Sequence, residues 1–96
     1  MEEYKTKDGQ MIIDFYSKEE SIVRFNLGRV FFCVKLEKFN IVDCDDSEMV
    51  NIYFHSNTCA PEKIELLSSE EAKEIAYFLN VQVYEYHENG NELIVK

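Results

Sequence analysis

Residues 68–80 read Ser-Ser-Glu-Glu-Ala-Lys-Glu-Ile-Ala-Tyr-Phe-Leu-Asn, and only this stretch has the pattern of an α-helix. Its small and apolar residues recur at helical spacing and therefore share one face: Ala72, Ile75, Ala76 and Leu79. Ser68 and Glu71 fit a capping box, in which each side chain accepts a hydrogen bond from the other residue's backbone amide. Asn80 tolerates the left-handed conformation that ends many helices. We therefore expect one helix near residues 69–80.

The rest of the chain consists of short segments whose apolar residues alternate with polar ones, as in half-buried strands. Before the helix these segments are residues 11–16, 22–27, 30–36, 49–55 and 64–67. Residues 30–36 are apolar on both faces, so we expect them to form the most buried strand. Phe39 and Ile41 either continue that strand after a bulge or form a second one. After the helix, residues 81–86 and 92–95 flank Asn89-Gly90, a strong signal for a hairpin turn.

These elements predict an α+β fold. It contains an antiparallel sheet of about five to seven strands, one helix packed on a face of the sheet, and a C-terminal β-hairpin. Residues 1–96 are expected to form a single domain. No apolar run approaches the ~20 residues of a membrane span, and the polar, acidic start of the chain lacks the features of a signal peptide. We therefore expect a cytoplasmic protein whose three cysteines are reduced.

Two groups of residues have the chemistry of metal ligands without the spacing of a known site. The acidic segment 43–48 has carboxylates of the kind that bind Ca²⁺, yet it lacks the glycine and the final glutamate of an EF-hand loop. His and Cys side chains of the kind that bind Zn²⁺ occur at Cys44, His55, Cys59 and His87, without the paired spacing of zinc sites. The sequence therefore predicts no metal ion and no cofactor.

A catalytic pair of Cys59 with His55 or His87 is also conceivable. The sequence has no nucleophile elbow, no glycine-rich oxyanion loop and no phosphate-binding motif of nucleotide-dependent enzymes. Cysteines with apolar neighbours, such as Cys33, are expected to pack as small hydrophobic residues. We therefore expect a protein that is not an enzyme.

The net charge is distributed unevenly along the chain. Residues 1–42 carry seven acids and seven bases, whereas residues 43–96 carry twelve acids and three bases, and with them the whole net charge of −9. A strongly negative surface repels nucleic acid and anionic membranes and attracts basic surfaces of other proteins. We therefore expect a basic protein surface as the partner, and no direct binding to nucleic acid or to a membrane.

The predicted binding surface combines the carboxylates of the second half with the tyrosines between them, since tyrosine is enriched at interfaces. Its residues are Glu70, Glu71, Glu74, Tyr77, Glu85, Tyr86 and Glu88, with Asp43, Asp45 and Asp46 as a second contact. Carboxylates on a rigid surface imitate a row of phosphates and suit a nucleic-acid-binding groove. The sequence therefore predicts an acidic inhibitor and nucleic-acid mimic, by analogy with phage anti-defence and immunity proteins. Two alternatives stay open: charge that serves only solubility, and a homo-oligomeric structural module (a homodimer, for example) joined through an exposed strand edge.

Overall fold

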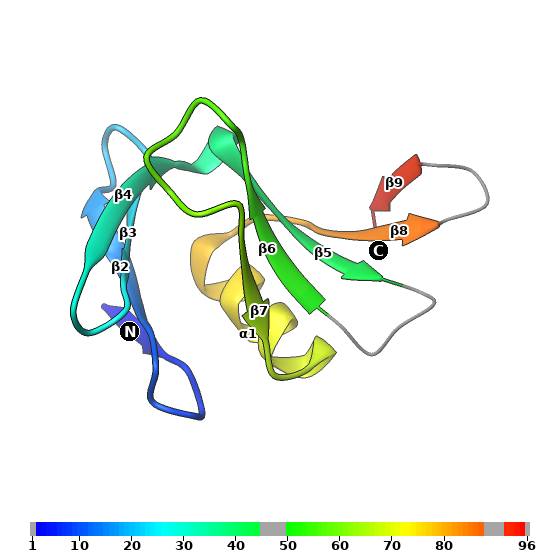
Figure 1. The fold of residues 1–96 in the computed structure, drawn as a ribbon, viewed down its shortest axis with the longest axis horizontal. Helices are drawn as coiled ribbons and strands as arrows, with labels where there is room; N and C mark the ends of the chain where they lie inside the picture. The colour runs from blue at the N-terminus through cyan, green and yellow to red at the C-terminus, as the bar shows by residue number, and fades with distance from the viewer. Residues whose placement is uncertain (1, 45–49, 88–91, 96) are drawn as a thin grey trace.

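The computed structural model describes residues 2–44, 50–87 and 92–95 of the chain, whose strands form two sheets around one α-helix (Figure 1). Sheet A is antiparallel with the order β1-β2-β3-β4, where the strands are β1 (Glu3–Lys5), β2 (Ile12–Ser17), β3 (Ile22–Asn26) and β4 (Phe31–Lys35). Sheet B has the order β7-β6-β5-β8-β9, where the strands are β5 (Phe39–Cys44), β6 (Val50–Phe54), β7 (Lys63–Leu66), β8 (Val83–His87) and β9 (Glu92–Val95).

The α+β class, the single late helix and the C-terminal pair of strands confirm the prediction from sequence. The predicted hairpin turn at Asn89-Gly90 lies outside the described residues. The sequence predicts one sheet, whereas the structure divides the strands between two and contains one parallel pair, β5 with β8. This pair is parallel because α1 (Ser69–Leu79) connects β7 to β8 and crosses one face of sheet B, and parallel strands need such a crossover.

α1 packs on sheet B with the face that its sequence predicts, since its small and apolar residues are buried: Ala72, Ile75, Ala76 and Leu79. The Ser68 hydroxyl oxygen accepts a hydrogen bond from the Glu71 backbone N–H at 3.1 Å. Asn80 ends the helix with φ 59° and ψ 48°, the predicted left-handed conformation. The other half of the capping box differs from the prediction, because the Glu71 carboxylate accepts from the backbone N–H of Lys7.

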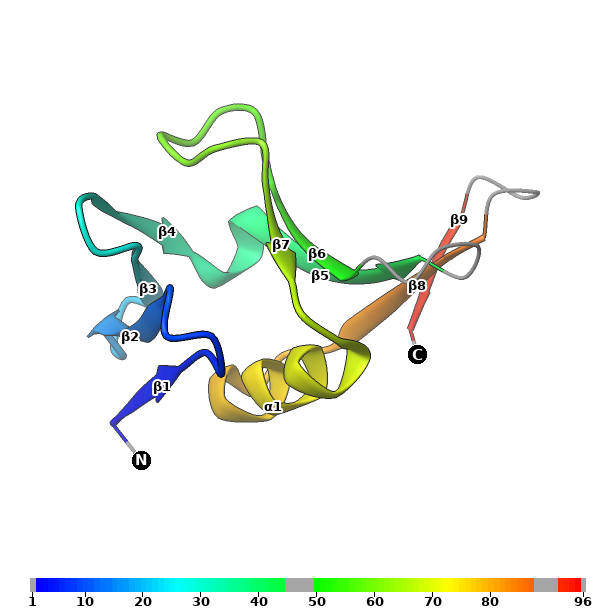
Figure 2. The same cartoon turned by 60° about the horizontal axis from the view of Figure 1, so that its bottom comes forward.

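One hydrophobic core joins both sheets and the helix. Phe25 of β3 is fully buried, and its ring centroid lies 5.3 Å from that of Phe39 and 5.2 Å from that of Phe54, both edge-on. A ring of sheet A therefore packs directly against two rings of sheet B. On the same face of sheet A, the rings of Tyr4 of β1 and Phe15 of β2 contact Phe78 of α1. Figure 2 shows α1 on one side of sheet B, with sheet A beside both.

The prediction that residues 30–36 form the most buried strand is wrong. β4 is an edge strand that pairs, among the described strands, with β3 alone, and only one of its faces meets the core. Val34 is buried, but Phe31 is 64% exposed and Val30 is 60% exposed. Cys33, expected to pack as a small hydrophobic residue, is exposed as well. A 3-10 turn, Leu36–Lys38, then separates β4 from β5, so residues 39–44 form a strand of the other sheet.

Candidate functional site

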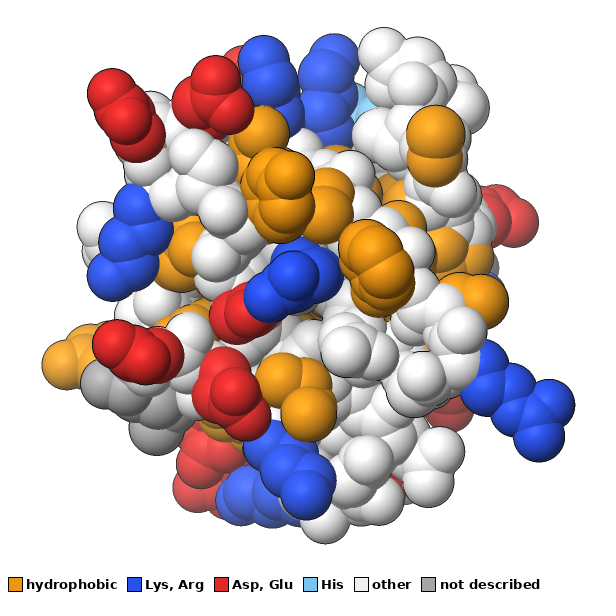
Figure 3. Space-filling model, turned by 90° about the vertical axis from the view of Figure 1, so that its left-hand side faces the viewer, with side chains coloured by type: hydrophobic (Ala, Val, Ile, Leu, Met, Phe, Trp, Pro, Cys, Tyr) orange, Lys and Arg blue, Asp and Glu red, His pale blue; other side chains and the backbone are white. Residues whose placement is uncertain are grey.

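The boundary between the two sheets is also a boundary in charge. Residues 1–38, which form sheet A and the 3-10 turn, carry seven acids and seven bases. Residues 39–96, to which sheet B and α1 belong, carry the whole net charge of −9. Figure 3 shows the side of the molecule on which sheet A lies, where acidic and basic side chains surround apolar ones. The fold therefore keeps the neutral part of the chain in a separate sheet from the acidic part.

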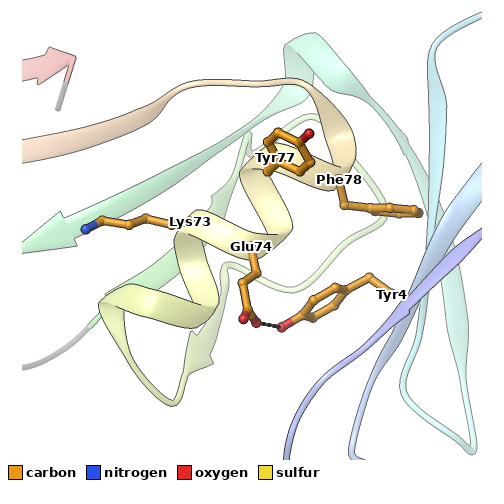
Figure 4. Close-up of a pocket in the computed structure, with 5 residues that line it drawn as sticks. All are labelled: Tyr4, Lys73, Glu74, Tyr77 and Phe78. Carbon is orange, nitrogen blue, oxygen red and sulfur yellow. Dashed lines mark hydrogen bonds between the residues drawn. The ribbon is translucent and has the colours of Figure 1, made fainter. Parts of the chain in front are cut away.

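A groove of about 750 Å³ lies between α1 and β1 and is lined by Tyr4, Lys73, Glu74, Tyr77 and Phe78 (Figure 4). Four of these residues lie on one side of α1, because helical neighbours are three or four positions apart. Tyr4 comes from β1, and its ring centroid lies 6.4 Å from that of Phe78. The Tyr77 side chain is 90% exposed. The groove therefore offers three aromatic rings and one carboxylate, with the Lys73 side chain also in its lining.

Glu74 is the carboxylate of this groove. Its Oε2 accepts a hydrogen bond from the Tyr4 hydroxyl at 2.7 Å, and its Oε1 lies 3.6 Å from the ammonium of Lys7. Burial, followed by the hydrogen bond to Glu74, raises the pKa of Tyr4 above its ordinary value, so the hydroxyl stays protonated as a donor. The Glu74 side chain is 42% exposed. A cation from solvent can therefore reach the carboxylate and compete with Lys7.

Two predicted binding residues instead hold the fold together. Glu71 is 1% exposed, and its Oε2 accepts from the Lys7 backbone N–H at 2.9 Å, which joins the turn after β1 to the start of α1. Asp43 is 8% exposed, and its Oδ2 accepts from the Ser69 hydroxyl at 2.9 Å. Neither carboxylate is presented to a partner in this conformation. Asp43 contacts the first turn of α1 and Glu71 lies in that turn, where the helix dipole favours negative charge.

Glu85 and Tyr86 are consecutive on β8 and therefore lie on opposite faces of sheet B. Glu85 is in register with Asp43, whose carboxylate meets α1, so Glu85 lies on the helix side. Tyr86 is in register with Cys44 and lies on the far side. There it lines a second hollow of about 320 Å³ together with Asn40, Val42, Cys44 and Tyr53. The predicted surface is therefore divided between two faces of the molecule.

The remaining predicted residues are placed only in part. Glu70 and Tyr77 are exposed on α1, and with Glu74 they form the part of the predicted surface that is continuous on one helix. Glu88, Asp45 and Asp46 lie outside the described residues. Tyr4, Lys73 and Phe78 line the groove but were not predicted from sequence. Phe78 had a usable signal, since it follows Glu74 by four positions on the same helix.

Asn51 is a buried polar residue beside the second hollow. It is fully buried and in register with Val42, and its Nδ2 donates to the Tyr53 hydroxyl oxygen at 3.4 Å. Within the described part of the chain its Oδ1 has no hydrogen-bond partner. Such an acceptor costs about 1–3 kcal/mol in lost hydration.

Among the described residues, no group of three or more His, Cys, Asp or Glu side chains is arranged to hold a metal ion. The helix in that part of the chain is too short and polar to cross a membrane. Comparison with known protein families, curated proteins and solved structures gives no match. What the site binds must therefore follow from its own chemistry. A carboxylate among aromatic rings suits an organic cation, because both groups attract positive charge.

Proposed function

We infer that the chain is a small, non-enzymatic binding protein whose acidic half occupies a basic surface of a partner protein. The main support is the groove beside α1, where the Glu74 carboxylate lies beside the rings of Tyr4, Tyr77 and Phe78. A lysine or arginine side chain fits this chemistry, since the carboxylate accepts its hydrogen bonds and the ring faces attract its charge. The net charge of −9 in the same half draws a basic partner in from a distance.

The class of partner follows from the same charges. Surfaces that bind nucleic acid carry clustered lysines and arginines, because those side chains neutralise phosphates. An acidic protein bound to such a surface blocks it, which is the inhibitory role of anti-defence and immunity proteins. Glu70 and Tyr77, both exposed on α1, extend the contact beyond the groove. The proposed role is therefore that of an inhibitor that competes with nucleic acid.

Affinity capture with charge-reversed variants tests this role. The acidic-side variant changes three exposed residues to lysine, namely Glu62, Glu65 and Glu70. A matched control changes three exposed residues on the sheet A side to lysine, namely Glu19, Glu20 and Glu37, none of which lies on β1 or in the groove lining. Each variant has the same net charge, six units more positive than the wild type. We expect a basic partner to bind the wild type and the control but not the acidic-side variant, and to be released by salt, which shortens electrostatic range. Equal capture by both variants contradicts the proposed function.

A second comparison separates the groove from the general charge. Tyr77→Ala removes an exposed ring of the groove without changing any charge, and Leu67→Ala removes an exposed apolar side chain, 58% accessible, outside the groove lining. Once a partner is captured, we expect Tyr77→Ala to weaken its binding about tenfold or more, as for a tyrosine at the centre of an interface. Leu67→Ala is expected to leave the affinity unchanged. The same affinity for both variants would mean that the groove is not the contact.

A further inference from the structure

The Glu74 carboxylate in the groove beside α1 is held only loosely by the cation next to it. Its Oε1 lies 3.6 Å from the Lys7 ammonium, and the Lys7 and Glu74 side chains are 57% and 42% exposed. A charge-assisted hydrogen bond is shorter, about 2.7–2.9 Å, and an ion pair so exposed to water contributes little. The Tyr4 hydroxyl takes one acceptor position of Oε2. Because each carboxylate oxygen has two acceptor positions, both oxygens can still accept from a further donor.

The aromatic rings of the groove lie on the same side of α1 as this carboxylate. Tyr77 and Phe78 follow Glu74 by three and four positions, which makes them its neighbours on the helix surface. The Tyr4 ring faces them from β1, with its centroid 6.4 Å from that of Phe78. Figure 4 shows the Lys73 side chain extending away from Glu74 and Phe78. The carboxylate and the rings can therefore contact one incoming group together.

A guanidinium group suits these neighbours better than an ammonium group does. It is planar and weakly hydrated, so it stacks on a ring and leaves water more readily than the compact, strongly hydrated ammonium. Its N–H donors form a flat fork, so it can bond to a carboxylate while its face lies on a ring. The chain's own ammonium, that of Lys7, stays 57% exposed at 3.6 Å from Glu74. An ammonium within reach of the groove therefore does not close on it.

We propose that the groove takes an arginine side chain of the basic partner in preference to a lysine, and that the guanidinium replaces the Lys7 ammonium at Glu74. This inference rests on the proposed function, since it names the side chain that the same groove binds. Arginine is enriched among the residues that dominate the affinity of protein interfaces, and it is a main phosphate-binding residue of nucleic-acid-binding surfaces. The Lys7 backbone stays in place during the exchange, because its N–H donates to Glu71. Lys7 is therefore an internal competitor for the site.

Two peptides of equal length, one of arginine and one of lysine, test the preference by isothermal titration calorimetry. They carry the same charge and so share the same long-range attraction to the acidic half. We expect the wild type to bind the arginine peptide about threefold more tightly or more. Tyr77→Ala should remove most of this ratio, and Tyr77→Phe, which keeps the ring, should retain it. Leu67→Ala is the control and should leave the ratio unchanged, because Leu67 is outside the groove lining.

The outcomes separate the arginine preference from the proposed function. Equal affinity of the wild type for the two peptides, or the same ratio in Tyr77→Ala and Leu67→Ala, overturns the preference. If both peptides bind and lose affinity equally in Tyr77→Ala, the proposed function stands without the preference. If neither peptide binds, both are contradicted.

A second pair of variants tests the exchange of Lys7. Lys7→Met and Lys63→Met each remove one positive charge from an exposed position, and only Lys7 contacts Glu74. Lys7→Met keeps the backbone N–H that donates to Glu71. We expect it to bind the arginine peptide about two- to fivefold more tightly than Lys63→Met does, because no ammonium then competes for Oε1. Equal affinity of the two variants overturns the role of Lys7 as a competitor.

Discussion

Replacing Glu71 with alanine is expected to destabilise the fold far more than replacing its neighbour Glu70. Both residues lie in the first turn of α1, so each loses a favourable interaction with the helix dipole worth about 0.3–1 kcal/mol. Only Glu71 is buried, and only its carboxylate accepts the Lys7 backbone N–H, at 2.9 Å. A hydrogen bond to a charged group contributes about 1.5–3 kcal/mol, and its loss leaves the amide without that acceptor. The free energy of unfolding should therefore fall by about 2–4 kcal/mol in Glu71→Ala and by less than about 1 kcal/mol in Glu70→Ala.

Urea unfolding followed by circular dichroism measures this difference. Each kcal/mol corresponds to about 4–8 °C in melting temperature for a domain of this size, so a thermal melt provides an independent value. Glu71→Gln keeps an acceptor oxygen and should recover part of the loss. Equal destabilisation by Glu70→Ala and Glu71→Ala would refute the conclusion that the Glu71 carboxylate joins sheet A to the helix.

Three other predictions follow from buried groups. The pKa of Tyr4 is raised in the fold, so its contribution to the free energy of unfolding is complete below about pH 10, the ordinary pKa of tyrosine, and is lost as the pH rises further and the unfolded phenol ionises. The difference in unfolding free energy between wild type and Tyr4→Phe, measured in urea, should therefore shrink from neutral to alkaline pH. A constant difference would contradict the raised pKa. Phe25→Ala should lower the free energy of unfolding by about 3–5 kcal/mol, because it empties the centre of the aromatic core. Phe31 is exposed, so Phe31→Ala should lower it by less than about 0.5 kcal/mol. Similar melting temperatures for the two variants would be inconsistent with this core. Asn51→Leu should stabilise the protein by about 1 kcal/mol, because it removes an acceptor without a partner. A urea midpoint lower than that of the wild type would show that Oδ1 has a donor in solution.

Local pattern was sufficient to predict α1. Its apolar spacing, its serine cap and its terminal asparagine act within a few residues of one another, so each is visible in a short window of sequence. The alternation of β6 likewise predicts the buried residues Val50, Ile52 and Phe54, although Asn51 between them is buried as well. A helix or strand whose apolar face is visible in a short window of sequence forms wherever the rest of the chain supplies an apolar surface for that face to pack on.

The burial of β4 could not be predicted, because it depends on which face of sheet A packs against sheet B and the helix. An apolar run of strand length indicates two buried faces, as in the middle of a sheet. In the structure, the 3-10 turn after Lys35 sends the chain into sheet B, and β4 is left at an edge. Phe31 and Cys33 are in register with Asn26 and Arg24 of β3, so they lie on the face of sheet A that is turned away from the core.

The roles of the carboxylates also depend on contacts between distant segments. Glu70 and Glu71 are adjacent and chemically identical, yet one is exposed and the other accepts a hydrogen bond from a residue 64 positions away. Tyr4 reaches Glu74 across 70 positions. Charge counts correctly indicated that the second half is acidic, but only the fold shows which of its acids can meet a partner.

The sharpest test of the binding role is titration of isotopically labelled protein with an arginine-rich peptide, followed by NMR chemical shifts and repeated at higher salt. We expect the largest shifts at the groove and along the exposed side of α1, at Glu74, Tyr77 and Phe78, with an affinity that falls as salt increases. Shifts that are spread evenly over both sheets, or that centre on the acids of sheet A, would contradict the assignment of this surface to a basic partner.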